Sequence, residues 1–203
     1  MNHVTSKLYS ILSLPIVYHI FQKIMKGDQM RKKIITAELK EKNLNVLDIG
    51  CGLGTSLDYL NKPNYFGYDI SDKYISYAKK KYKNIGTFYC KKFTERELKN
   101  LEKFDYVILM GILHHLSEIE IKNLMELIKK ALKKDGKIVT LDPVFTKNQN
   151  LIAKFLISND RGKNIKTKKN YLKLLGKYFK KTKSKIYHQN FIPYTWFTTI
   201  CSN

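Results

Sequence analysis

Arginine, cysteine and long apolar runs are all scarce in this 203-residue sequence, and each scarcity narrows the range of functions. Only three of the 38 basic residues are arginines, although the formal net charge is +21. Proteins that read bases or phosphates usually recruit arginine for its bidentate guanidinium group. The lysine excess therefore favours a solvated surface set by composition, and a nucleic-acid partner is possible but not favoured.

The three cysteines, Cys51, Cys90 and Cys201, are odd in number and lack the spacing of a metal site. We expect reduced thiols in a cytoplasmic protein. The most apolar stretch, residues 8–25, is interrupted by one proline and several polar residues, and it falls short of the ~20 residues that a spanning helix needs. No small-residue cleavage site follows it, so neither a membrane span nor a signal peptide is expected.

Three of the ten glycines stand together in the stretch Asn45–Thr55, which reads NVLDIGCGLGT. A short apolar run, interrupted only by Asp48, predicts a strand buried on both faces. Gly50, Gly52 and Gly54 follow directly. Because they have no Cβ atoms, they allow a tight turn and let a ligand lie against the main chain. This pattern indicates a nucleotide-cofactor site.

Two classes of cofactor compete for such a loop. A dinucleotide site requires Gly-x-Gly-x-x-Gly, but Thr55 occupies the third glycine position of that template. A nicotinamide enzyme is therefore the least favoured. Asp48 is placed to accept hydrogen bonds near the ligand. A helix expected at about residues 55–60 directs its N–H groups and positive dipole end at the same spot.

From residue 45 onward, strand and helix patterns alternate, which predicts a parallel sheet. The expected strands span residues 46–49, 65–69, 87–90, 104–110 and 137–141, followed by two closing strands at 183–189 and 194–201. Helices are expected before the first strand, after Ser71, at capping boxes that begin at Thr94 and Ser117, and at about 150–157 and 168–179.

Four of these pieces, in this order, resemble the class I S-adenosylmethionine-dependent methyltransferases. Asn45–Gly54 resembles their motif I, Tyr65–Ser71 their ribose-binding acid segment, Phe104–Leu116 their strand-four motif, and Leu132–Pro143 the helix-turn-strand that follows. The likeness is firm over residues 43–145. The tail resembles bacterial members of the small-molecule type whose substrate is unassigned, through its Asp-Arg-Gly stretch and the turn before Tyr194.

The resemblance implies an α/β fold with a Rossmann-like, doubly wound, seven-stranded sheet whose last strand is antiparallel, preceded by N-terminal helices. It implies one domain over residues 1–203. Within it we expect an N-terminal helical cap (1–42), a cofactor-binding core (43–145), and lid helices with a closing hairpin (146–203).

The resemblance also implies S-adenosylmethionine as cofactor. Asp69, followed by Ile70, ends the second strand and is expected to bind the ribose, because a vicinal diol offers two donors and a carboxylate accepts both. Relatives carry an acid after the third strand for the adenine, but this sequence has a cysteine and two lysines there. The remaining cofactor-binding candidates are Asp48, Gly50, Cys51, Gly52, Gly54, Thr55, the backbone near Cys90 and Lys91, Met110, Gly111 and, on an N-terminal helix, Tyr18.

Tyr18 is open to a second interpretation, as an ordinary residue of an amphipathic helix face. The acceptor side is also open. Methyl transfer is an in-line displacement, for which positioning alone can supply ~7–11 kcal/mol, and a base helps where the acceptor must lose a proton. His114 and His115 follow the fourth strand and are the best base candidates. Alternatively, one of them orients the loop.

Asp142 is the second base candidate, or else a turn acid before proline. Arg161 either clamps a carboxylate or phosphate of the substrate or pairs with Asp160 on the surface. We expect no metal site, because adjacent histidines should point in different directions and lack a third ligand nearby.

The sequence thus predicts an enzyme that methylates a small molecule, with a hydroxyl of a sugar or another metabolite as the acceptor. The alternatives are an RNA or protein methyltransferase that uses the lysine-rich surface, and a non-catalytic module that binds the cofactor. The sequence leaves the oligomeric state open.

Overall fold

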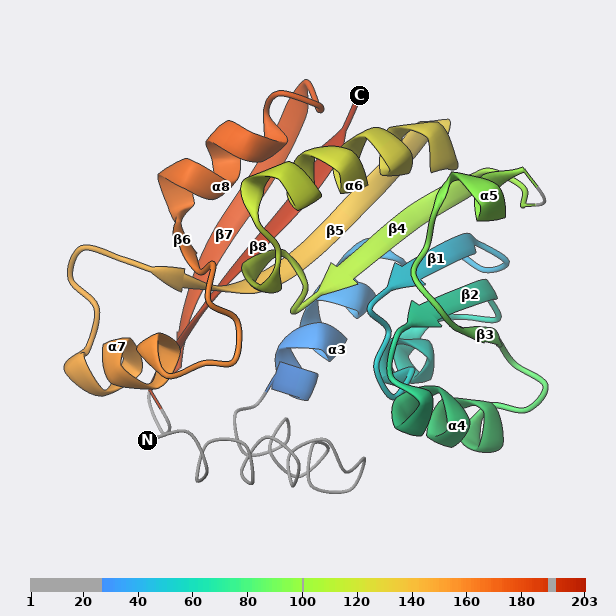
Figure 1. Ribbon diagram of the computed structural model, residues 1–203, viewed down its shortest axis with the longest axis horizontal. Coiled ribbons are helices and arrows are strands. Elements are labelled where there is room, and N and C mark those ends of the chain that lie inside the picture. The colour runs from blue at the N-terminus through green and yellow to red at the C-terminus, as the bar shows by residue number, and fades with distance from the viewer. Residues whose placement is uncertain (1–26, 100, 190–192) are drawn as a thin grey trace.

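A computed structural model describes residues 27–99, 101–189 and 193–203 (Figure 1). Its centre is an eight-stranded sheet with the order β3-β2-β1-β4-β5-β8-β7, and β6 pairs with β5 beside this path. The strands are β1 (Asn45–Ile49), β2 (Asn64–Asp69), β3 (Thr87–Cys90), β4 (Phe104–Met110), β5 (Leu132–Phe145), β6 (Lys166–Thr167), β7 (Lys181–Gln189) and β8 (Tyr194–Ser202).

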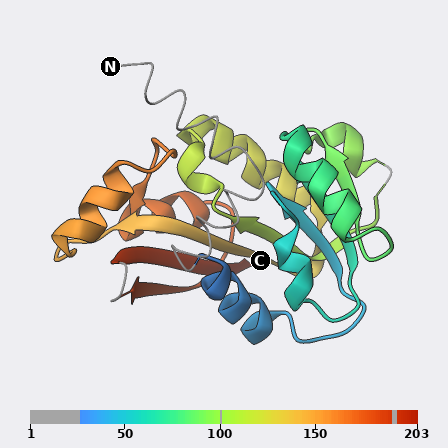
Figure 2. The same cartoon turned by 90° about the horizontal axis from the view of Figure 1, so that it is seen from below.

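Helices cover both faces of the sheet. They are α3 (Gly27–Glu38), α4 (Asp72–Lys81), α5 (Glu95–Leu98), α6 (Glu118–Ala131), α7 (Leu151–Ser158) and α8 (Lys168–Leu175), with 3₁₀ helices η1 (Thr55–Tyr59) and η2 (Leu113–His115). The buried residues of α3, α4 and α7 belong to one apolar cluster, and those of α6 and α8 belong to another. Figure 2 shows α3 and α6 on opposite sides of the sheet.

Apolar alternation along the central strands builds these two clusters. In β4, Ile108 and Met110 face the cluster of α3, whereas Val107 and Leu109 face the cluster of α6. A strand buried on both faces must be apolar on both, which is why β4 is apolar from Tyr106 to Met110.

The strand order places the site. Chain order runs outward from β1 to β3 on one side, and from β4 to β5 on the other. In open α/β sheets, ligands bind at such a switch point, beyond the carboxyl ends of the strands. β8 runs antiparallel between β5 and β7, which confirms the Rossmann-like fold with an antiparallel last strand.

The predicted helix starts are present. The Ser71 hydroxyl accepts a hydrogen bond from the Tyr74 N–H, and the Ser117–Glu120 capping box opens α6. These caps satisfy N–H groups that have no partner within the helix. Across the described residues, no helix has both the length and the apolar character that a membrane crossing requires.

Three local predictions were wrong. The helix after the glycines is a five-residue 3₁₀ helix, too short to direct a large dipole at the loop. β5 begins at Leu132, because Leu132 pairs with Phe104 before a register shift. The two-residue strand β6 was not predicted. The helix expected within residues 15–25, with Tyr18, lies outside the described residues.

Candidate functional site

A cavity of about 950 Å³ opens where the carboxyl ends of β1, β2 and β4 meet. Glycine-loop residues, the end of β2 and the segment after β3 form one part of its lining. The turn after β4 and the side of α6 form another. The residues that line it include Gly50, Gly52, Asp69, Met110, His115 and Arg161.

The glycine loop uses its own N–H groups within the protein. The Gly50 and Cys51 N–H groups both donate to the Tyr68 carbonyl, at 2.7 and 3.1 Å. The Gly52 N–H donates to Asp69 Oδ2 at 2.9 Å, and the Gly54 N–H donates to the Cys51 carbonyl at 2.9 Å. A phosphate cradle needs free N–H donors. Four N–H groups of this loop are already bonded within the protein, so they are not available to a phosphate.

Positive φ angles explain why glycine is needed here. Gly50, Gly52 and Gly54 have φ values of 70°, 55° and 73°, in the left-handed region that L side chains rarely adopt. A Cβ atom on Gly54 would also lie 2.7 Å from the Phe88 ring. The loop is therefore held in one shape by conformation and by packing.

Asp69 is fixed at the cavity wall by two backbone donors. Its Oδ1 atom accepts the Ser71 N–H at 2.8 Å, while Oδ2 accepts the Gly52 N–H. Burial raises the pKa of Asp69, and these hydrogen bonds oppose that rise. Each carboxylate oxygen can accept a further hydrogen bond, so Asp69 retains the capacity to bind a diol.

Asp48, Cys51, Gly54 and Thr55 were expected beside the ligand, but none of them lines the cavity. Asp48 is buried beneath the loop, and its Oδ2 atom accepts the Tyr65 hydroxyl at 2.8 Å. Burial raises its pKa to about 6. The side chains of Asp48, Cys51 and Thr55 are buried behind the loop and support it from that side.

An arginine that the sequence analysis did not single out secures the back of the loop. The Arg31 Nη1 atom of α3 lies 2.6 Å from Thr55 Oγ1 and 3.3 Å from Asp28 Oδ1. The Tyr59 hydroxyl donates to the other oxygen of Asp28 at 2.6 Å. These contacts tie α3 to η1. Nothing in the local sequence indicates this role of Arg31, because its partner Thr55 lies in another element.

The outer wall is apolar. Ile70 has 71% of its surface exposed, and with Phe93 it lines the cavity from two different segments. Lys91 also lines it, and its Nζ atom lies 3.2 Å from Glu97. Cys90 does not line the cavity. Apolar side chains on two sides suit a flat ring system, and Phe93 was missed because it reads as an ordinary core residue.

On the other side of the cavity, Met110 and Gly111 end β4, and His115 and Arg161 line the adjoining surface. Gly111 has a φ of 78°, and its N–H donates to the Leu141 carbonyl at 2.7 Å. This backbone turn carries the chain from β4 into η2. Arg161 reaches the same cavity from the loop after α7.

His114 does not line the cavity; it is buried between two carboxylates. Its Nδ1 atom lies 2.8 Å from Asp142 Oδ1, and its Nε2 atom lies 3.3 Å from Asp160 Oδ1. Burial opposes a charge on this ring, but the hydrogen bonds and charges of Asp142 and Asp160 outweigh burial and raise the pKa of His114 to about 9. His114 and Asp142, predicted as bases, are therefore used in this internal bridge.

The bridge extends further. Asp160 Oδ2 accepts the Tyr194 hydroxyl at 2.8 Å, and Asp160 Oδ1 accepts the Gly162 N–H at 2.8 Å. Burial would raise the pKa of Asp160, but its partners, chiefly His114, lower it to about 2. The bridge thus joins the turn after β4, strand β5, the loop after α7 and strand β8.

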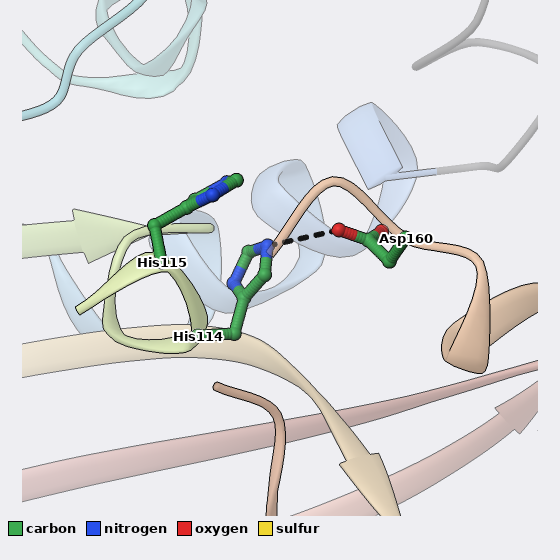
Figure 3. Close-up of side chains that lie close together, drawn as sticks. All are labelled: His114, His115 and Asp160. Carbon is green, nitrogen blue, oxygen red and sulfur yellow. Dashed lines mark ion pairs between the residues drawn. The ribbon is translucent and has the colours of Figure 1, made fainter. Parts of the chain in front are cut away.

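The His115 ring packs against the His114 ring in a tilted arrangement, with centroids 4.1 Å apart and an angle of 40° between the planes. Burial and the neighbouring charge of His114 lower the pKa of His115 to about 4. Figure 3 shows both rings and Asp160 on one side of the turn. The expectation that the adjacent histidines lack a third ligand nearby was wrong, because ligand atoms of His114, His115 and Asp160 all lie within 4.8 Å of one another.

Several solved structures with a similar fold are methyltransferases. An S-adenosylmethionine-dependent methyltransferase from Archaeoglobus fulgidus has a TM-score of 0.69 at 18% identity, over 92% of this chain and 99% of that chain. The N-methyltransferase NodS from Bradyrhizobium japonicum WM9 has a TM-score of 0.67 at 14% identity, over 86% and 94%. Magnesium protoporphyrin IX methyltransferase from Synechocystis PCC 6803, solved with bound S-adenosylmethionine, has a TM-score of 0.59 at 19% identity, over 88% and 82%. The fold is thus that of the Rossmann-like methyltransferases.

The family follows from the sequence match. A model described as a methyltransferase domain matches residues 40–195, so this chain belongs to that family, whose members use S-adenosylmethionine. An uncharacterized protein of Methanocaldococcus jannaschii is 31% identical over 156 residues, or 75% of this chain. The chain spans 57% of the length of that relative.

Proposed function

We propose that this protein transfers a methyl group from S-adenosylmethionine to a small molecule, with a hydroxyl of a sugar or another metabolite as the acceptor. The observation that carries the proposal is the pairing of the glycine loop with Asp69. Four loop N–H groups are already used, so we propose that the loop binds the ligand through carbonyl oxygens, and Asp69 is fixed at the wall with capacity to accept further hydrogen bonds.

Both features fit the cofactor's chemistry. Its amino group is a cationic donor, and its ribose diol donates two hydrogen bonds that one carboxylate can accept. The apolar side chains of Ile70 and Phe93 suit the adenine ring. Packing against them would hold the adenine, for which relatives carry an acid. A dinucleotide would place phosphates at the loop, where Gly50, Cys51, Gly52 and Gly54 have no N–H to give.

When bound, the cofactor supplies an activated methyl group on a sulfonium. The chain's own task is to hold the acceptor in line and keep water out. Met110, Gly111 and Ile112 provide that wall, and His115 and Arg161 are the polar groups that line it. We propose that His115 contacts the acceptor atom and that Arg161 binds a polar or anionic part of the same molecule.

A small-molecule acceptor fits a cavity of about 950 Å³ that the protein's own lid segment borders through Arg161. The division into cap (1–42), core (43–145) and lid (146–203) is part of this proposal, as is a cytoplasmic location. Cys51, Cys90 and Cys201 are all free thiols, which supports a reducing compartment.

Calorimetric titration of S-adenosylhomocysteine tests the proposal, with wild type, Asp69→Ala and Asp69→Asn compared. We expect saturable binding to wild type and a loss of about tenfold or more in Asp69→Ala, or ~1.4 kcal/mol. Asp69→Asn keeps the shape but weakens acceptance of a diol, so it should fall between the two. NAD serves as the control ligand. Binding of NAD in place of the homocysteine compound would overturn the proposal.

An RNA acceptor is the second candidate, because the charge is unevenly distributed. All 17 acidic residues precede Arg161, whereas residues 161–203 carry ten lysines and one arginine. In α8 and β7, the lysines at 168, 169, 173, 181, 183 and 185 are exposed. A steep decrease in RNA affinity with salt, relieved by Lys181→Gln with Lys183→Gln, would support this candidate. Salt-independent or absent binding would exclude it.

A further inference from the structure

His114, His115 and Asp160 form a cluster (Figure 3), and His115 lines the cavity on the side proposed for the acceptor. Two imidazoles and one carboxylate are the ligand types that Zn²⁺ and related divalent transition metals take. We propose that Nε2 of His114, one ring nitrogen of His115 and a carboxylate oxygen of Asp160 bind one such ion.

The separation of two ligand atoms already suits an ion. His114 Nε2 and Asp160 Oδ1 are 3.3 Å apart. Metal–nitrogen and metal–oxygen bonds of about 2.1 Å separate neighbouring ligands by roughly 3.0–3.4 Å, depending on the angle. An ion can therefore occupy the position between these two atoms without a shift of the backbone.

His115 completes the set with a small adjustment. The ligand atoms of all three residues lie within 4.8 Å of one another. The ring nitrogen of His115 must therefore move about 1–2 Å closer to the other two ligand atoms for all three to reach one ion at the usual bond length. His115 is exposed and lines the cavity, so its ring has room to turn. The close packing of Gly162 against His114 keeps that second ring in place.

The groups behind these ligands orient them. Asp142 accepts both the backbone N–H of His114 and its Nδ1, at 3.1 and 2.8 Å, so Nε2 faces Asp160. A carboxylate on the second nitrogen of a ligand histidine is a common feature of metal sites. Tyr194 and the Gly162 N–H hold the Asp160 carboxylate in the same way.

The remaining coordination positions would face the cavity, because His115 and Arg161 both line it. Three protein ligands leave a position for water or a substrate atom. In the proposed methyltransferase, an ion there would polarise an acceptor oxygen and ease loss of its proton to solvent. That role rests on the proposed function, whereas binding of the ion does not.

Cobalt(II) titration of the full-length, chelator-treated protein tests the site, because its visible absorption reports the ligand set directly. We expect saturable binding of about one ion per chain, with the absorption of a nitrogen- and oxygen-ligated ion. Zn²⁺ should displace it and abolish the absorption. His115→Gln should weaken cobalt binding about tenfold or more, and Asp142→Asn should do so through the orientation of His114.

His188→Gln is the matched control, since His188 is an exposed histidine on β7, away from the cluster. It should leave cobalt binding unchanged. Circular dichroism and thermal melting establish whether each variant is folded. If Asp142→Asn does not fold, His115→Gln still tests the site, because it is a substitution on the cavity wall that should leave the fold intact. Absence of saturable binding, equal affinity in His115→Gln, or loss in His188→Gln would each overturn the inference.

Titration of S-adenosylhomocysteine into the same samples separates this inference from the proposed function. Binding of the homocysteine compound without cobalt binding removes the metal site and leaves the methyltransferase proposal standing. Cobalt binding without binding of the homocysteine compound removes the methyltransferase proposal and leaves the metal site standing.

Discussion

The two sides of the cavity are built in different ways. The cofactor side consists mainly of backbone, in a loop of consecutive residues with three positive φ angles and one carboxylate, Asp69, fixed by N–H groups. The proposed acceptor side is supported from behind by side chains of four segments, which form the buried bridge of Asp142, His114, Asp160 and Tyr194. Local sequence specifies the first side, whereas only the completed fold specifies the second.

This difference predicts how each side fails. Changes on the cofactor side should alter ligand affinity through the shape of the loop. Changes on the acceptor side should first cost stability, because a buried polar bridge leaves unsatisfied groups when one member is lost. The variants below test this contrast.

The largest effect is expected from Asp142→Ala. It leaves the backbone N–H and Nδ1 of His114 buried without an acceptor. Loss of one partner from a buried pair costs ~3–5 kcal/mol, which urea denaturation should detect as a lower free energy of unfolding. Asp69→Ala, on the partly exposed cavity wall, is the control and should cost much less. Equal losses in both variants would contradict the contrast.

Asp48 should make stability depend on pH. Burial raises its pKa in the folded protein from 3.8 to about 6. The folded state therefore binds the proton more tightly than the unfolded state does. The resulting stabilisation, about 3 kcal/mol, is fully present below about pH 4 and is lost as the pH rises through about 6.

Asp48→Asn removes the titrating group. Urea denaturation at pH 4 and pH 7 should therefore show a smaller decrease in the free energy of unfolding for the variant than for wild type. The difference between the two proteins cancels the effects of other groups. Parallel pH profiles would show that Asp48 is ionised as easily in the folded chain as in the unfolded one.

Two glycine substitutions should separate the sides. Gly54→Ala forces a Cβ atom to 2.7 Å from the Phe88 ring at a positive φ, and Gly162→Ala forces one to 1.9 Å from His114 Cδ2. Each should destabilise by about 1–3 kcal/mol. Calorimetry should find reduced affinity for S-adenosylhomocysteine in Gly54→Ala only. Reduced affinity in both variants would mean that the two sides are coupled.

The smallest effects are expected from two tyrosines. Tyr65 donates to Asp48 behind the loop, and Tyr194 donates to Asp160 in the bridge, each at 2.8 Å. Substitution of either by phenylalanine should cost about 1–2 kcal/mol in unfolding experiments. Tyr194→Phe should also weaken cobalt binding, whereas Tyr65→Phe should not, which makes the second variant a control for the first.

The sequence predicted the cofactor side because its signals are local. Gly50, Gly52 and Asp69 lie within 20 residues of one another, and all three line the cavity. Caps at Ser71 and Ser117 were also readable, since a cap and its helix are adjacent. What local sequence did not show is direction: Asp48 and Thr55 belong to the same stretch but face the core.

The acceptor side was only partly predictable. His114, His115, Asp142 and Arg161 were identified from their positions after strands and on the lid, but their division of labour depends on contacts across the fold. Asp160 contacts His114, and Tyr194 contacts Asp160, from segments far apart in the sequence, and no periodicity predicts such contacts. β5 was predicted to begin late because its first residues are lysines and an aspartate, which resemble a turn.

The position of β8 has a consequence for folding kinetics. β8 lies between β5 and β7, and pairs such as Ile138 with Cys201 join segments far apart in sequence. Closing so large a loop is entropically costly, so docking of β8 should be a late and slow event. Tyr194 begins this strand. During refolding, the ability to bind S-adenosylhomocysteine should therefore appear before the protection of Tyr194 from solvent.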